Sequence, residues 1–395
     1  MTKVLQYIIV CYAFFVPLSR AGIVFFSMIL IVSWLFEAGF QKKYRLLSQS
    51  KVILSLFAFL LFNVIALLWS DDIFNAYKYI LKYWYFLPIV VLFTSLQKEY
   101  VSKVLSAFIA GMLLSEIISY GIFFEIWDFN GATSKNPSPF MHHIEYSIFL
   151  AFTALILLGR MFNHQDTKYK IVYSLFFITI TGNLFLNAGR TGQVAFLLGI
   201  FVLALLSFKN KLKAFVVFIL LTTIISLFAL NFSSTFKTRI TQGKENLVQA
   251  VEQQEYCSSL GSRVGACIVA SDMVTDNLIL GVGIVDNMQV FHQRIDEKYP
   301  KMKCLHPIFM HMHNQFFQIT TQLGIIGLLI FLTLFYTIFR LPIRSEEYKN
   351  IKYTYVILLM FSFIPEVLFH RQFSMALFTL IVGLLLAQYR IENEV

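Results

Sequence analysis

Long apolar runs separated by short polar connections recur from one end of the chain to the other. A run of roughly 18 or more apolar residues can cross a bilayer as a helix. Lipid offers no hydrogen-bond partners, so a spanning backbone must pair within its own segment, whereas a β-barrel would show short alternating segments. The pattern therefore predicts an all-α integral membrane protein with about 12 transmembrane helices. The predicted spans are residues 4–18, 21–38, 52–69, 80–96, 104–125, 142–159, 171–187, 191–207, 214–230, 314–339, 351–369 and 373–388.

The composition agrees with this class of protein. Hydrophobic residues occupy 58% of the 395 positions and charged residues only 14%, too few to cover a soluble protein of this size. The first run is short and basic at its start, which also fits a secretory signal peptide. However, the sequence PLSRAG leads straight into the second run without a small-residue cleavage site, so we expect residues 4–18 to remain as a span.

The distribution of lysine and arginine predicts the orientation in the membrane. One set of connections, together with Lys3 and Arg390, carries 18 basic residues, whereas the short connections on the other side carry six. Basic residues are enriched in cytoplasmic loops. Both termini should therefore face the cytoplasm. The basic connections are residues 41–51, 97–103, 160–170, 209–213 and 340–352.

A large polar insertion, residues 231–313, interrupts the apolar pattern between the ninth and tenth spans. It divides the chain into residues 1–230 with spans one to nine, the insertion itself, and residues 314–395 with the last three spans and a short tail. Apolar residues at helical spacing predict that the insertion is helical. Its eight basic and eight acidic residues cancel, so the net charge of +10 reflects topology. Nothing in the chain resembles a nucleic-acid-binding motif.

The four cysteines leave the redox chemistry open. Cys11 lies in a predicted span, whereas Cys257, Cys267 and Cys304 lie in the insertion. Three cysteines can form at most one bridge within the chain, and the sequence does not decide which pair it would join or whether all stay free. No CxxC or Cys/His spacing indicates a zinc site.

Two glycine-flanked arginines are candidates for anion binding on the outer side. Arg190 lies between Gly189 and Gly192 in a connection too short to carry it far from the membrane. Arg263 lies near the start of a predicted helix, where backbone N–H groups also favour anions. An arginine at a span end is commonly a simple interface anchor. Two of them beside glycines, which allow close backbone approach, favour a phosphate or diphosphate ligand.

The stretch HMHNQFFQ, residues 311–318, places costly polar groups at the start of the tenth span. If that helix begins near Asn314, His313 lies at its positive end, which favours a neutral imidazole able to act as a base. The alternative role is an interfacial histidine bonded to a loop carbonyl. A metal site formed with His292, His306 and His311 is also conceivable, but no HExxH-like frame supports it.

Five short motifs follow one another between residues 189 and 327. They are GRTG at 189–192, GSR at 261–263, NLILGVGI at 277–284, HMHNQFFQ at 311–318 and LGIIG at 323–327. In this order, and with the insertion before the tenth span, they resemble the O-antigen ligase and polymerase superfamily of bacterial inner membranes. The specific part of the resemblance covers residues 187–327.

The resemblance implies a polyprenyl-phosphate-dependent membrane glycosyltransferase, embedded in lipids of the inner membrane with its active site on the periplasmic face. The donor would be an undecaprenyl-diphosphate-linked glycan and the acceptor a sugar of the lipid A–core. The transfer would invert the anomeric centre and use neither a metal nor a cofactor.

The resemblance also implies roles for particular residues. Arg190 and Arg263 match the arginines that bind the donor diphosphate in the family, and His313 matches its essential histidine. The residues around these three are expected to support them, namely Gly189, Gly192, Ser262, His311 and Asn314.

Several alternatives stay open. The same motifs occur in O-antigen polymerases and protein O-oligosaccharyltransferases, so an O-antigen ligase is the favoured but not the sole function. Glu116 and Glu366, both placed within predicted spans, would be expected in a transporter or flippase. We expect a structural ion pair for Glu116. For Glu366, with His370 and Arg371 nearby, both a part in the donor pocket and an internal ion pair are possible.

Overall fold

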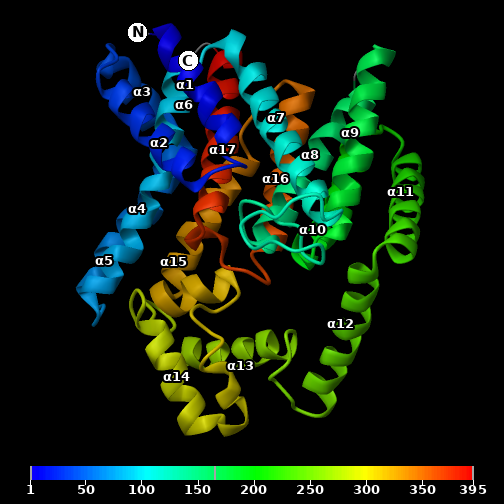
Figure 1. Ribbon diagram of the computed structural model, residues 1–395. Helices are drawn as coiled ribbons and strands as arrows, with labels where there is room; N and C mark the ends of the chain where they lie inside the picture. Colours follow the sequence, from blue (N-terminus) through cyan, green and yellow to red (C-terminus); the bar gives the residue numbers. More distant parts are fainter. Residues whose placement is uncertain (1, 164–165, 394–395) are drawn as a thin grey trace.

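The computed structural model describes residues 2–163 and 166–393, and its regular elements over these ranges are helices (Figure 1). Both termini lie at one end of the bundle, which we call the proximal end; α12, α13 and α14 lie at the opposite, distal end. The helices are α1 (Thr2–Phe15), α2 (Arg20–Leu35), α3 (Phe40–Gln49), α4 (Lys51–Ile65), η1 (Ala66–Leu68), α5 (Ile73–Leu81), η2 (Lys82–Phe86), α6 (Pro88–Ser95), α7 (Lys98–Phe123), α8 (His143–Asn163), α9 (Thr167–Leu186), α10 (Arg190–Ser207), α11 (Lys211–Phe232), α12 (Ser234–Glu252), α13 (Gly261–Asp276), α14 (Asp286–Lys298), η3 (Pro300–Leu305), α15 (Gln315–Phe339), α16 (Glu346–Ser362), η4 (Leu368–His370) and α17 (Gln372–Asn393).

Eight helices of the described chain are long and apolar enough to cross a membrane, or nine if the bent pair α2 and α3 forms one span. The prediction of a helical membrane protein is therefore confirmed, but four of the predicted spans are not among these eight helices. Residues 4–18 form a shorter apolar helix, and α2 turns by 116° into α3. The other two predicted spans, 80–96 and 351–369, are interrupted.

Both interruptions occur beside prolines. In residues 80–96, the 3-10 helix η2 separates α5 from α6, and Pro88 occupies the first turn of α6, where its missing N–H leaves no gap. In residues 351–369, α16 ends at Ser362, shortly before Pro365. Proline disfavours helical geometry in the residue before it. Glu366 therefore lies in the connection between α16 and α17, and the prediction that it lies within a span is wrong.

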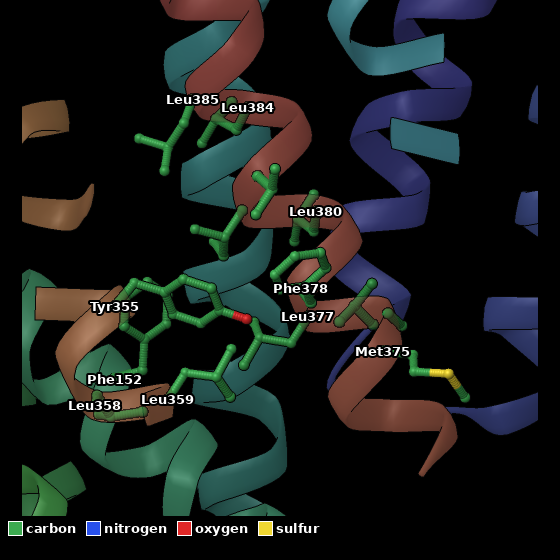
Figure 2. Close-up of a cluster of buried hydrophobic side chains, with 14 of the residues drawn as sticks. Phe152, Tyr355, Leu358, Leu359, Met375, Leu377, Phe378, Leu380, Leu384 and Leu385 are labelled. Atoms are coloured by element: carbon green, nitrogen blue, oxygen red, sulfur yellow. The ribbon is translucent and has the colours of Figure 1, made fainter. Parts of the chain in front are cut away.

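Helix α17 forms the centre of the bundle. All residues from Phe373 to Ala387 are buried, as expected for a helix that is hydrophobic all round. It packs against α2, α6, α7 and α16. Figure 2 shows Leu377 and Phe378 of α17 beside Tyr355 of α16 and Phe152 of α8. This central helix begins at Gln372 and thereby fixes the position of the polar segment that precedes it.

The insertion is helical, as predicted, and has a small core of its own. Helix α13, helix α14 and η3 enclose apolar side chains that include Val269, Phe291 and Phe309. A disulfide joins Cys257 to Cys304, which resolves the pairing that the sequence left open. Cys267 and Cys11 remain as free thiols.

The NLILGVGI motif joins the insertion to the bundle by docking into a break in α15. Gly324 interrupts the helix with φ +67° and ψ −168°. The freed backbone groups pair with the motif: Val282 N–H donates to Thr321 O at 2.9 Å, and Ile325 N–H donates to Leu278 O at 2.8 Å. A Cβ on Gly324 would lie 2.1 Å from Ile279 O, so the contact requires glycine. The break holds the first turns of α15 against the insertion.

Candidate active site

Basic side chains from three segments converge on one buried carboxylate at the distal end. Glu366 has a fully buried side chain whose Oε1 lies 2.9 Å from Nη2 of Arg263 in α13. Its Oε2 lies 3.4 Å from Nη2 of Arg371, and Oε1 lies 3.6 Å from Nδ1 of His313. We call these four residues the Glu366 cluster. The ion-pair interpretation of Glu366, one of the two that the sequence left open, is confirmed.

The surroundings of Glu366 favour its ionised form. Burial acts to raise the pKa of the carboxyl group, but contact with His313 and the charges of Arg263 and Arg371 outweigh it and lower the pKa to about 2. Removing either arginine would leave part of a buried negative charge without compensation. The cluster therefore depends on all its members.

The two arginines of the cluster have further contacts that fix their positions. Arg263 donates from Nε to Pro365 O at 3.3 Å and from Nη1 to Ser259 O at 3.2 Å. Arg371 also approaches Glu145 of α8, with 3.9 Å between Nη1 and Oε2. Glu145 itself accepts hydrogen bonds from the backbone and hydroxyl of Ser374. The cluster thus ties the insertion to α8 and α17.

His313 is held in an unusual backbone conformation immediately before α15. Its φ is +47°, in the left-handed region that non-glycine residues occupy at a cost. Its N–H donates to Nδ1 of His311 at 3.2 Å, and its ring lies edge-on to Phe309 with 4.8 Å between ring centres. Helix α15 begins at Gln315 with Asn314 as its N-cap. The Nδ1 atom of His313 faces Glu366. The contacts with Phe309 and His311 fix the position of the His313 ring.

A cavity of about 220 Å³ lies beside the cluster and contains both predicted anion-binding arginines. We call it the arginine pocket. Arg190 enters it from the first turn of α10 and Arg263 from the first turn of α13, so two helix N-termini also face this region. Its lining residues are His143, Ile144, Ala188, Arg190, Thr191, Val194, Ser259, Leu260, Arg263, Phe361 and Pro365. No carboxylate is among them within the described ranges.

The glycines that flank Arg190 allow close helix packing, and their expected role beside a ligand stays a prediction. A Cβ on Gly189 would lie 2.4 Å from Ser147 Oγ, and one on Gly192 would lie 2.2 Å from the Ser147 carbonyl carbon. Both glycines therefore let α10 approach α8 closely. Gly192 N–H also donates to Ser147 Oγ at 3.1 Å. This close packing fixes the backbone that carries Arg190.

The other expected supporting residues have local structural contacts. Ser262 Oγ donates to Ser259 O at 3.2 Å, within the turn that starts α13. Asn314 accepts the Phe317 N–H at 3.0 Å as the cap of α15. His311 lies on the far side of the cluster from the arginine pocket. Burial, followed by the charge of His313, lowers the pKa of His311 to about 3, so it is neutral at physiological pH.

The histidines considered for a metal site separate into two pairs. His292 stacks on His306 with 4.6 Å between ring centres, and His311 contacts His313 at 4.2 Å. Over residues 2–163 and 166–393, no three His, Cys, Asp or Glu side chains form a group suited to hold a metal ion.

Glu116 does not form the structural ion pair that we expected. Its two carboxylate oxygens are buried in α7 and have no hydrogen-bond partner in the described part of the chain. Helix α7 packs against α1 and α9, and the described ion pairs do not include Glu116. The charge pattern of the sequence contains no information about which helices become neighbours, and for this reason it could not exclude an ion pair.

These observations define the class of protein: a multi-pass helical membrane protein with a buried histidine–glutamate–arginine cluster at one end. Residues 175–332 match the family model described as O-antigen ligase. The match includes Arg190, Arg263 and His313 and confirms the resemblance to the O-antigen ligase and polymerase superfamily. A search of curated proteins finds no match to the chain.

Proposed function

We propose that this protein transfers a glycan from undecaprenyl diphosphate to a sugar hydroxyl of the lipid A–core, as an O-antigen ligase. The observation that carries the proposal is the position of His313, which is oriented by the buried Glu366 and lies next to a pocket with two arginines. The family match supports a lipid-linked glycan as substrate. An O-antigen polymerase would use the same donor chemistry with a different acceptor.

His313 is proposed to be the general base. With Nδ1 directed to Glu366, its Nε2 is the atom available to accept the proton of the acceptor hydroxyl. The hydroxyl oxygen then forms a bond to the anomeric carbon while the bond from that carbon to the diphosphate oxygen breaks. The proton ends on His313, and the electron pair leaves with undecaprenyl diphosphate. Attack from the face opposite the leaving group inverts the anomeric centre.

Arg190 and Arg263 are proposed to stabilise the departing diphosphate. A diphosphate gains negative charge as the glycosidic bond breaks, and fixed cations at that position lower the barrier. The cavity of about 220 Å³ is small beside the roughly 300–1,000 Å³ of typical ligand pockets. We therefore assign it to the diphosphate group, with the glycan outside it and the lipid chain against the helices.

The same proposal fixes the arrangement in the membrane. We expect the twelve predicted segments to cross or enter the bacterial inner membrane. Helices α2, α5, α6 and α16 form parts of the segments that are not long unbroken helices. Both termini share the proximal end with the basic connections, which supports a cytoplasmic location for that end. The distal end, with residues 231–313 and the cluster, then faces the periplasm.

A reconstituted transfer assay tests this function. The purified full-length protein would be given undecaprenyl-diphosphate glycan and lipid A–core with a chelator present. Glycan attached to the core would support a metal-independent ligase. Elongation of the lipid-linked glycan without modification of the core would show a polymerase, and absence of both products from folded protein would overturn the proposal. In a deletion strain, a ligase defect leaves finished polymer on the carrier lipid.

A further inference from the structure

A second cavity lies on the other side of the Glu366 cluster from the arginine pocket. Its volume is about 380 Å³, and α5, η2, α15 and the connection before α17 contribute to its lining. Lys78 and Lys82 face it, together with His311, His370 and Gln318. We call it the lysine pocket. The transfer mechanism proposed above does not use any of its residues directly.

Three consecutive residues form the wall between the two pockets. Pro365 lines the arginine pocket and Val367 lines the lysine pocket. Glu366 lies between them and contacts His313 with its carboxylate. His311, the neighbour of His313 in the same turn, faces the lysine pocket. The proposed base is therefore located at the boundary between two cavities, as a transfer reaction between two bound substrates requires.

The lysine pocket has positive charge that is not neutralised by its own walls. Lys78 and Lys82 are both basic, and across the ranges that the structure describes no Asp or Glu lines the cavity. Two nearby carboxylates have other partners: Asp286 accepts from the backbone N–H groups of Asp71 and Asp72, and Asp72 accepts from Asn75, with the charge of Lys78 as a smaller influence that also lowers the pKa of Asp72. Two ammonium groups in one cavity favour the binding of an anionic ligand.

The position of Lys82 is set by a neutral partner. Its Nζ donates to Nε2 of His370 at 2.9 Å, and the His370 ring stacks on Tyr79 with 4.6 Å between ring centres. Burial, and then the charges of Lys82 and Arg371, lower the pKa of His370 to about 4. The imidazole therefore accepts a hydrogen bond from Lys82 without neutralising its charge, and the remaining ammonium protons are available to a ligand.

The geometry points to the lysine pocket as the subsite for a phosphate group carried by the acceptor saccharide. This inference rests on the proposed function. A phosphate monoester carries about −1.5 to −2 charges at neutral pH, which matches two ammonium groups better than a single carboxylate does. Lysine binds phosphate as a point charge. A phosphate held here would place a neighbouring sugar hydroxyl near His313, opposite the diphosphate in the arginine pocket.

A binding experiment tests the subsite without catalysis. Lipid-free phosphorylated core oligosaccharide, and the same oligosaccharide after phosphatase treatment, would be titrated into full-length protein by calorimetry. Wild type should bind the phosphorylated form roughly tenfold or more tightly than the treated form. Lys78→Ala together with Lys82→Ala should remove this preference, while Lys135→Ala, in another connection on the same side of the predicted topology, should keep it. Equal binding of both oligosaccharides by wild type would overturn the inference.

A second experiment separates a sugar phosphate from a lipid headgroup. Nanodiscs of phosphatidylglycerol should not reduce binding of the phosphorylated oligosaccharide more than nanodiscs of phosphatidylcholine. Competition by phosphatidylglycerol alone, lost in the double lysine variant, would assign the pocket to a lipid headgroup and refute the acceptor assignment.

Kinetics distinguish failure of the subsite from failure of the proposed function. In the transfer assay, the double lysine variant should raise the KM for the acceptor roughly tenfold or more and leave the KM for the donor unchanged. Transfer with an unchanged acceptor KM would refute the subsite and leave the ligase function intact. Phosphate-dependent binding by a wild-type protein that transfers nothing would keep the subsite and refute the ligase function.

Discussion

Two groups of charged side chains, one at each end of the bundle, differ in burial and in the number of their partners. At the proximal end, Arg160 pairs with Glu347 at 2.8 Å beside a cavity of about 390 Å³. Glu347 has 40% of its side chain exposed. At the distal end, Glu366 is fully buried, and two arginines and a histidine surround it. One end has a matched pair open to solvent, whereas the other holds a carboxylate that organises several basic groups.

Neither the size of a cavity nor the charge of its lining identifies an active site by itself. The proximal cavity is larger than the arginine pocket, but an arginine and a glutamate both line it and cancel. The distal pockets contain Arg190, Arg263, Lys78 and Lys82 without a carboxylate in their described linings. Arg263 is paired with the buried Glu366, whereas Lys78 and Lys82 have no carboxylate in the described lining of their pocket. A further proximal cavity, of about 440 Å³, contains Lys51 and Arg340 and likewise has no carboxylate in its described lining, so the proposed diphosphate site rests on its position beside the Glu366 cluster.

The largest expected effect compares the two glutamates. Replacing Glu366 with glutamine keeps the shape but removes the only negative charge among the cluster's four residues, and breaking a buried pair costs about 3–5 kcal/mol. Glu347→Gln removes a partly exposed partner, which costs about 0–1 kcal/mol. Thermal unfolding in detergent should show a clear decrease in Tm for Glu366→Gln and little change for Glu347→Gln. Equal losses would remove the distinction between the two ends.

The next comparison uses two arginines at the distal end. Arg190→Ala removes a cation from the arginine pocket and should raise the KM for the lipid-linked donor roughly 10–100-fold, the value of one charge-assisted hydrogen bond. Arg294, in the same insertion as Arg263, pairs with Asp272 and Asp276 outside that pocket. Arg294→Ala should leave the donor KM unchanged. Similar donor KM values for both variants would contradict the assignment of the diphosphate.

A smaller effect is expected from substitution of Gly324, at the break in α15 that holds His313 in place. Alanine at Gly324 must adopt φ +67° and would also meet Ile279 O at 2.1 Å. Alanine at Gly39, at the proximal end, must adopt φ +91° but has no heavy atom within 4 Å in the described structure. Alanine in the left-handed conformation of Gly39 costs about 1–2 kcal/mol, and alanine at the φ/ψ of Gly324, which is essentially restricted to glycine, costs about 1–3 kcal/mol. Only Gly324→Ala should lose more stability than its backbone conformation costs and also lose transfer activity.

The smallest expected effect is a change in stability at low pH. The pKa of Glu366 is lowered from 4.5 to about 2 in the folded protein, so its stabilisation is complete above about pH 4.5 and is lost as the pH falls towards about 2. In that window the unfolded chain binds more protons than the folded chain. Wild type should therefore lose Tm more steeply on acidification than Glu366→Gln, which lacks the group. Parallel pH profiles would show that Glu366 is not held in its ionised form.

The sequence predicted the participants of the site better than their arrangement. Arg190, Arg263 and His313 carry motifs, and the structure places Arg190 and Arg263 in one pocket and joins Arg263 to His313 through Glu366. The sequence could not decide the role of Glu366, because that role depends on Pro365 ending the helix and on contacts with distant residues. Arg263, for example, lies more than 100 positions away along the chain.

The fold shows the same division between local and long-range information. Hydropathy found the long helices because each buries its own backbone, but it could not detect breaks such as the one at Gly324, which exists because the NLILGVGI segment supplies hydrogen bonds from outside. The packing role of Gly189 and Gly192 could not be predicted for the same reason. Their need for small size comes from Ser147 on a neighbouring helix.

The central claim is that His313 acts as the base of glycan transfer. The most direct measurement is the rate of transfer from undecaprenyl-diphosphate glycan by His313→Ala, with His306→Ala in the same insertion as the control and Tm values to confirm folding. Loss of general-base catalysis should reduce kcat roughly 10²–10⁴-fold in His313→Ala, with little change in His306→Ala. Full activity in a folded His313→Ala protein would contradict the account and leave the HMHN stretch as an interface anchor.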